Sequence, residues 1–74
     1  MINKTALLQA LNKEGKTLKD LAQACKISTR SMSRRVNGYV DFTTNEMDAC
    51  KRFLHLSCQE STAIFFPGVL QYKG

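Results

Sequence analysis

The residues best able to do chemistry lie in one short stretch, STRSMSRRVN at residues 28–37. Helical periodicity puts Met32 and Val36 on one apolar face and Arg34 on the opposite face. Four polar residues accompany Arg34: Arg30, Ser33, Asn37 and, at the helix start, Thr29. An α-helix fits the DNA major groove, where arginine can donate two hydrogen bonds to guanine. Serine and threonine can form hydrogen bonds with bases or with phosphates. We therefore predict that this face reads DNA, the ordinary alternative being a solvated charged face.

The positive charge of the chain is concentrated around the same stretch. The sequence has 11 Lys and Arg against 6 Asp and Glu, a formal net charge of +5. Between residues 16 and 35 the only acid is Asp20, and the bases are Lys16, Lys19, Lys26, Arg30, Arg34 and Arg35. Bases and acids in the rest of the chain cancel. A local basic cluster favours a polyanionic partner such as double-stranded DNA.

The remaining reactive residues make a poor catalytic or metal site. Cys50, His55 and Cys58 offer three ligands without an obvious fourth, and zinc sites show tighter paired spacing. No acid is placed to orient a Cys–His nucleophile, and no phosphate-binding glycine loop is present. We therefore predict no enzyme, no metal and no cofactor. An RNA-binding module is disfavoured because the basic face lacks aromatic residues on which single-stranded bases stack.

Length and composition predict a single domain over residues 1–74. Apolar residues make up 43% of the chain, which is ordinary for a folded protein. No apolar run resembles a signal peptide or a membrane span. The three cysteines are odd in number and form no CxxC pair, which favours reduced thiols and a cytoplasmic location.

The hydrophobic pattern predicts an all-α fold of five short helices. Capping boxes begin at Thr17, Thr43 and Ser57, while Asn3 and Ser28 cap the other two helices. The loop at residues 39–42 should turn Val40 and Phe42 inward, and residues 67–74 have no clear assignment. The predicted apolar helix faces are Leu7, Leu8 and Leu11; Leu18, Leu21, Ala22 and Cys25; Met32 and Val36; Met47, Cys50, Phe53 and Leu54; and Ile64 and Phe65.

Residues 17–38 resemble the helix-turn-helix of Cro/CI-type (XRE) regulators. The matching features are a small residue within the first helix, an apolar residue in the turn, a Ser-Thr start, a buried apolar residue and a closing Asn-Gly: Ala22, Ile27, Ser28-Thr29, Met32 and Asn37-Gly38. The order of later residues extends the likeness to small regulators of temperate phages of Gram-positive bacteria: Phe42, Glu46-Met47, Phe53-Leu54 and Ile64-Phe65-Phe66.

The resemblance implies a sequence-specific regulator of a phage lysis–lysogeny switch in the cytosol of a bacterial host. It implies base contacts by Thr29, Arg30, Ser33 and Arg34, and phosphate contacts by Ser28, Asn37, Lys19 and Lys26. The family also leads us to expect an operator bound by a homodimer, although a monomer stays open because the sequence shows no firm dimer element.

Two positions depart from the family pattern. Leu18 replaces the usual glutamine at the start of the first helix, and Lys26 replaces the usual glycine in the turn. A lysine adopts the left-handed conformation only at a cost of about 1 kcal/mol. These departures support an alternative, a modulator of repression that binds the phage CI repressor and blocks its operator binding. Such a protein would use exposed apolar residues, for which the candidates are Tyr39, Val69, Leu70 and Tyr72; the last three could equally fold back over the core.

Overall fold

The computed structural model describes residues 2–68, and within them the backbone forms five helices and no strand. In chain order these are α1 (Lys4–Lys13), α2 (Leu18–Ala24), α3 (Thr29–Val36), α4 (Thr44–Phe53) and α5 (Cys58–Phe65). The predicted all-α fold of five helices is confirmed. None of these five helices is long and apolar enough to cross a membrane. The expectations for Val69, Leu70 and Tyr72 lie outside the described residues.

Each helix begins where a side chain caps the unpaired backbone N–H groups of its first turn. All three predicted capping boxes form, at Thr17, Thr43 and Ser57. In the first of them the Thr17 hydroxyl accepts from the Asp20 N–H at 3.2 Å, and the Asp20 carboxylate accepts from the Thr17 N–H at 2.9 Å. That backbone hydrogen bond lowers the pKa of Asp20. Helix starts were therefore predictable because capping chemistry is local.

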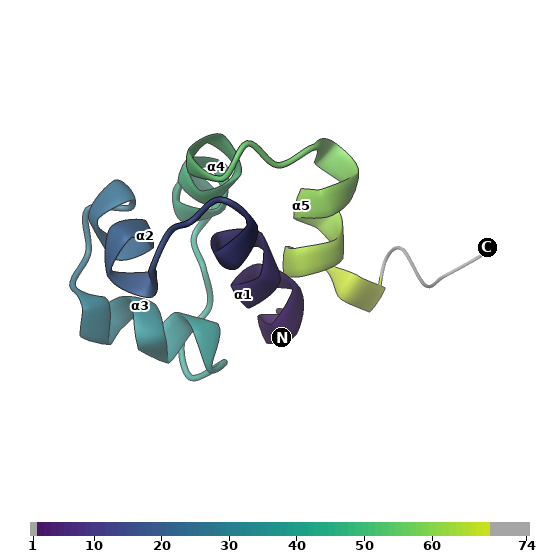
Figure 1. The fold of residues 1–74 in the computed structure, drawn as a ribbon. Helices are drawn as coiled ribbons and strands as arrows, with labels where there is room; N and C mark the ends of the chain where they lie inside the picture. Colours follow the sequence, from purple (N-terminus) through teal and green to yellow (C-terminus); the bar gives the residue numbers. More distant parts are fainter. Residues whose placement is uncertain (1, 69–74) are drawn as a thin grey trace.

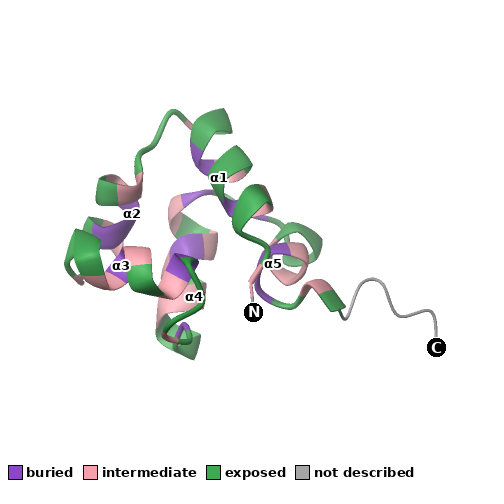
Figure 2. Cartoon of the chain, turned by 90° about the horizontal axis from the view of Figure 1, so that it is seen from below, coloured by how far each residue is buried: buried purple, intermediate pink, exposed green. Residues whose placement is uncertain are grey.

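The five helices are arranged in three groups along the length of the molecule. Figure 1 shows α2 and α3 together at one end, α5 at the other, and α1 and α4 between them. Figure 2 shows buried residues on the inner sides of the helices, with exposed residues on the outside. The buried core comprises Leu7, Leu11, Leu21, Ala22, Met32, Val36, Phe42, Cys50, Leu54, Leu56, Ile64 and Phe65.

Most of the predicted inward residues are buried, with one clear error. Leu8 is 42% exposed, because it lies about 100° around the helix from its buried neighbour Leu7. In the loop, Phe42 is buried and Val40 is half-buried. The Phe42 ring packs edge-on against Phe65 with the ring centroids 5.1 Å apart. This contact joins the loop that follows α3 to α5.

The connection between α2 and α3 makes a left-handed turn at Lys26, with φ of +61°. Its path is fixed by two backbone hydrogen bonds, from Lys26 N–H to Gln23 O and from Ile27 N–H to Ala22 O. Gly15 directly follows the C-cap of α1 and has φ of +67°, a conformation that glycine adopts without steric cost. Lys26 has a Cβ, so the same conformation is strained there. The chain therefore keeps the turn geometry expected of glycine while placing a lysine at it.

Replacing Lys26 with glycine should relieve this strain. We expect Lys26→Gly to raise the free energy of unfolding by about 0.5–1 kcal/mol, the strain relieved being partly offset by the greater freedom of glycine in the unfolded chain. Urea denaturation followed by circular dichroism measures the change. The matched control is Lys19→Gly, which places glycine inside helix α2 and should lower stability by about 0.5–1 kcal/mol. Equal losses in both variants would contradict the strain at Lys26.

Candidate nucleic-acid interface

Helix α3 packs against the core through a narrow apolar face. Met32 is fully buried and Val36 is 3% exposed, as predicted, and no other residue of the helix is buried. The Ser28 hydroxyl caps the helix by accepting from the Ser31 N–H at 3.0 Å. Because so little of α3 faces the core, the greater part of its circumference is available for another partner.

One arginine of α3 is committed to the fold. Arg35 Nε lies 2.8 Å from Glu46 Oε1, and both side chains are largely buried. Arg35 Nη1 also donates to the Ser31 carbonyl at 3.2 Å. The same Glu46 oxygen accepts from the Thr43 N–H at 3.0 Å, within the cap of α4. Arg35 therefore ties α3 to α4, and its charge is neutralised inside the protein.

Arg30 and Arg34 have a different environment. Both are exposed, and neither forms an ion pair within residues 2–68. Together with Tyr39 they line an open hollow of about 320 Å³. Tyr39 follows α3 in the chain and is 78% exposed. The structure thus brings to one surface an aromatic ring and two guanidinium groups that have no ion-pair partner in the described part of the chain.

A second polar group lies at the C-terminal end of α3. Asn37 Nδ2 donates to the Ser33 hydroxyl at 3.3 Å, and Asn37 Oδ1 accepts from Lys4 Nζ at 2.7 Å. Lys4 begins α1 and stands 33 residues earlier in the chain. The sequence offered no local signal for this contact. Lys4 is a further cation at the predicted interface that sequence reasoning missed.

The remaining predicted site residues belong to α2, to the segment that leads into α3 and to the first position of α3. Ser28 and Thr29 are exposed, as are Lys26 in the connection and Lys19 in the first turn of α2. Lys16, which belongs to the same basic cluster, extends over the Phe53 ring with its Nζ 5.3 Å from the centroid. The free cations are therefore distributed at both ends of α3 and along its exposed side. A helix N-terminus adds partial positive charge and unpaired N–H groups suited to phosphate.

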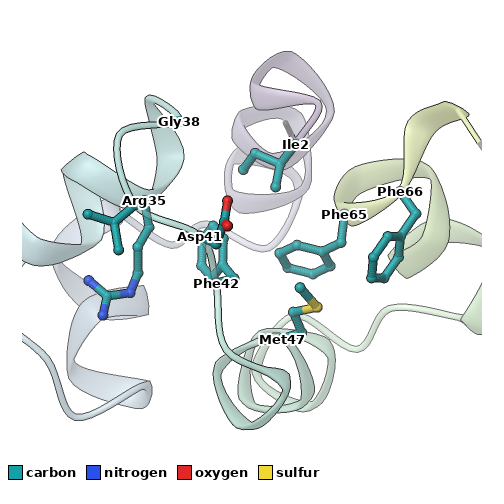
Figure 3. A pocket seen from close by; sticks show the side chains of 9 residues that line it. Ile2, Arg35, Gly38, Asp41, Phe42, Met47, Phe65 and Phe66 are labelled. Atoms are coloured by element: carbon teal, nitrogen blue, oxygen red, sulfur yellow. The ribbon is translucent and has the colours of Figure 1, made fainter.

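Beside this face is an apolar groove of about 300 Å³. Figure 3 shows Phe42, Phe65 and Met47 lining its floor, with Phe66 at one side and Arg35 at the other. Phe66 is 51% exposed. Among the described residues that line this groove, Arg35 and Asp41 are the charged ones.

The cysteine and histidine residues do not gather into a metal site. Within residues 2–68 no group of three metal-ligating side chains occurs. Cys50 is buried in α4, Cys58 is exposed at the start of α5, and His55 is exposed between them. Cys58 Sγ instead accepts from Lys51 Nζ at 3.1 Å.

Comparison of the chain with models of known protein families, with curated proteins and with solved structures found no match.

The ion pair between Arg35 and Glu46 leads to a prediction about pH. Burial raises the pKa of Glu46, but the Thr43 hydrogen bonds and the Arg35 charge outweigh it, so the pKa lies below its ordinary value. A depressed carboxyl pKa stabilises the fold at neutral pH, and this contribution is lost as the pH falls below the ordinary glutamate pKa and through the lowered pKa of Glu46. We expect Glu46→Gln to be less stable than the native protein at pH 7, with the difference shrinking towards pH 3.

Urea denaturation at several pH values measures this difference. The control is Asp48→Asn, which removes an exposed carboxylate on the same helix, 3.0 Å from Arg52. Exposed ion pairs contribute little to stability, so this variant should follow the native protein at every pH. A Glu46→Gln deficit that stays constant across the pH range would show that the ion pair is not the cause.

Proposed function

We propose that the protein is a sequence-specific DNA-binding regulator in which α2 and α3 act as a helix-turn-helix and α3 enters the major groove. The observation that carries this proposal is the contrast among three arginines of one helix. Arg35 is neutralised by Glu46, whereas Arg30 and Arg34 are exposed without an ion pair in the described chain. Arg30 and Arg34 thus remain available to bind an anionic partner.

The dimensions and polarity of α3 suit this role. Its eight residues span about 12 Å, and helix-turn-helix proteins place the N-terminal part of such a helix against base edges. We assign base contacts to Thr29, Arg30, Ser33 and Arg34. Bidentate hydrogen bonds from arginine to guanine are the commonest specific contact of this kind.

Phosphate contacts are assigned to polar groups at the two ends of α3 and to one lysine of α2. At the start of α3 these are Ser28 and Lys26; at its end, Asn37 and Lys4; in α2, Lys19. The hydrogen bond between Lys4 and Asn37 supports the second group, because it holds the ammonium beside the end of the helix. Phosphate contacts fix the register of a protein on DNA, and base contacts supply the specificity.

The proposed biological role is that of a Cro/CI-type regulator in a phage lysis–lysogeny switch. It rests on the resemblance of residues 17–38 and on the left-handed turn at Lys26, where that family usually has glycine. A two-fold operator bound by a homodimer is the expected arrangement for a helix-turn-helix protein.

The two arginines provide the direct test. A selection from random duplexes would supply the preferred site, and fluorescence anisotropy would measure affinity for it. We expect Arg30→Ala and Arg34→Ala each to weaken specific binding by about 1–3 kcal/mol, and Lys26→Ala to reduce the salt slope by about one. The control is Arg52→Ala, which removes an exposed arginine from α4. If all three arginine variants bind alike, direct readout by α3 is wrong.

A second candidate function is a modulator of repression that binds a CI-type repressor. The observation that favours it is Tyr39, which is 78% exposed beside Arg30 and Arg34. Tyrosine and arginine are enriched among the residues that dominate protein–protein binding energy. In this reading the hollow they line receives a side chain of the repressor, and DNA is not bound.

Binding to a purified CI-type repressor distinguishes the two functions. The modulator reading predicts a repressor complex without a DNA complex at about 50–200 mM salt, and a loss of roughly 30-fold or more for Tyr39→Ser. The matched control is Leu8→Ser, which removes another exposed apolar side chain, from α1. A native protein that binds DNA and ignores the repressor excludes the modulator reading.

A further inference from the structure

The connection between α2 and α3 contains a cysteine whose sulfur touches a second sulfur in α4. Cys25 Sγ lies 3.7 Å from Cys50 Sγ, and the two residues are 25 positions apart in the chain. Cys25 is the C-cap of α2, and Cys50 is completely buried near the middle of α4. A disulfide has an S–S distance of about 2.0 Å, so the sulfurs must approach by roughly 1.7 Å to bond.

The surroundings make this pair inert under reducing conditions. Cys25 Sγ also donates to the Glu46 carbonyl oxygen at 3.8 Å. Burial raises the pKa of the Cys25 thiol and, more strongly, that of Cys50. Both therefore stay as thiols at neutral pH and pack as small apolar groups. Cys25 is only half-buried, so it is the sulfur that a reagent from solvent would reach first.

We propose that Cys25 and Cys50 form a reversible oxidation site, at which a disulfide ties the connection before α3 to α4. The oxidant is a low-molecular-weight disulfide. The small fraction of Cys25 that loses its proton to solvent attacks one sulfur of the reagent as a thiolate, breaks its S–S bond and releases one small thiolate. Cys50 then loses its proton to the released thiolate, attacks Cys25 Sγ, forms the protein disulfide and displaces the second small thiolate. Two protein thiols are oxidised, and one small disulfide is reduced to two thiols, which take up both protons.

The position of Cys25 gives this bond a consequence for α3. Lys26 follows it directly and makes the left-handed turn, and Ser28, three residues after Cys25, caps α3. Drawing Cys25 towards α4 moves the residues that set the start of α3. The consequence for DNA rests on the proposed function: the oxidised form should bind its preferred duplex about tenfold more weakly, the equivalent of losing one contact.

The cross-link is tested on the full chain without DNA. The starting protein is Cys58→Ser, which removes the exposed third thiol and with it random coupling between molecules. Incubation with glutathione disulfide should give a monomer that is lighter by two hydrogen atoms, and proteolysis should release the peptides containing Cys25 and Cys50 joined together. Dithiothreitol should restore the original mass.

Two further variants, made in the Cys58→Ser protein, test whether the internal disulfide requires both Cys25 and Cys50. Cys58→Ser with Cys25→Ser changes the half-buried position, and Cys58→Ser with Cys50→Ala changes the buried one; neither should form the internal bond. Circular dichroism checks that each is folded. A folded Cys58→Ser protein that yields only a glutathione adduct, or disulfide-linked dimers, overturns the proposal.

Anisotropy with the oxidised and reduced protein then tests the consequence for DNA. An unchanged dissociation constant overturns control of α3 by this bond. If neither form binds DNA, the proposed function fails, while the mapped cross-link still decides whether the oxidation site exists.

Discussion

A single carboxylate oxygen, Oε1 of Glu46, connects helix α3, which carries most of the candidate interface, to the start of helix α4. It accepts from the Thr43 N–H at 3.0 Å and from Arg35 Nε at 2.8 Å. The hydrogen bond from Thr43 caps the start of α4, and the contact with Arg35 holds α3 against α4. An eight-residue helix is not stable alone, and α3 buries only Met32 and Val36. Its orientation therefore depends on this shared contact as well as on apolar packing.

The anchoring of α3 divides its arginines between structure and surface. Arg35 reaches towards α4 and meets Glu46, whereas Arg30 and Arg34 lie on the side away from the buried Met32. On the side of α3 that faces α4, an arginine neutralises a largely buried acid. On the opposite side, two arginines have no ion-pair partner among the described residues. Burial requires a paired charge, while exposure allows an unpaired one. The net positive charge consequently appears where a polyanion can approach.

The candidate interface is open and spread over several elements. Its cations come from α1, α2, the α2–α3 connection and α3, and the hollow beside Tyr39 is a shallow part of the surface. Small-molecule sites bury most of their ligand in a concave pocket. An extended, open, basic surface is better suited to a macromolecule, which is why both proposed functions involve one.

The sequence by itself determined the five helices and their starts, because capping boxes and apolar periods act within one or two turns. It also determined that Met32 and Val36 face inward and Arg34 outward. Leu8 was misplaced because adjacency to Leu7 does not make a helical face. Only the tertiary structure decided that Arg35 is neutralised, that Lys4 reaches Asn37 and that Cys25 touches Cys50. Each of these contacts joins residues distant in the chain, and no local rule specifies which distant partners folding brings together.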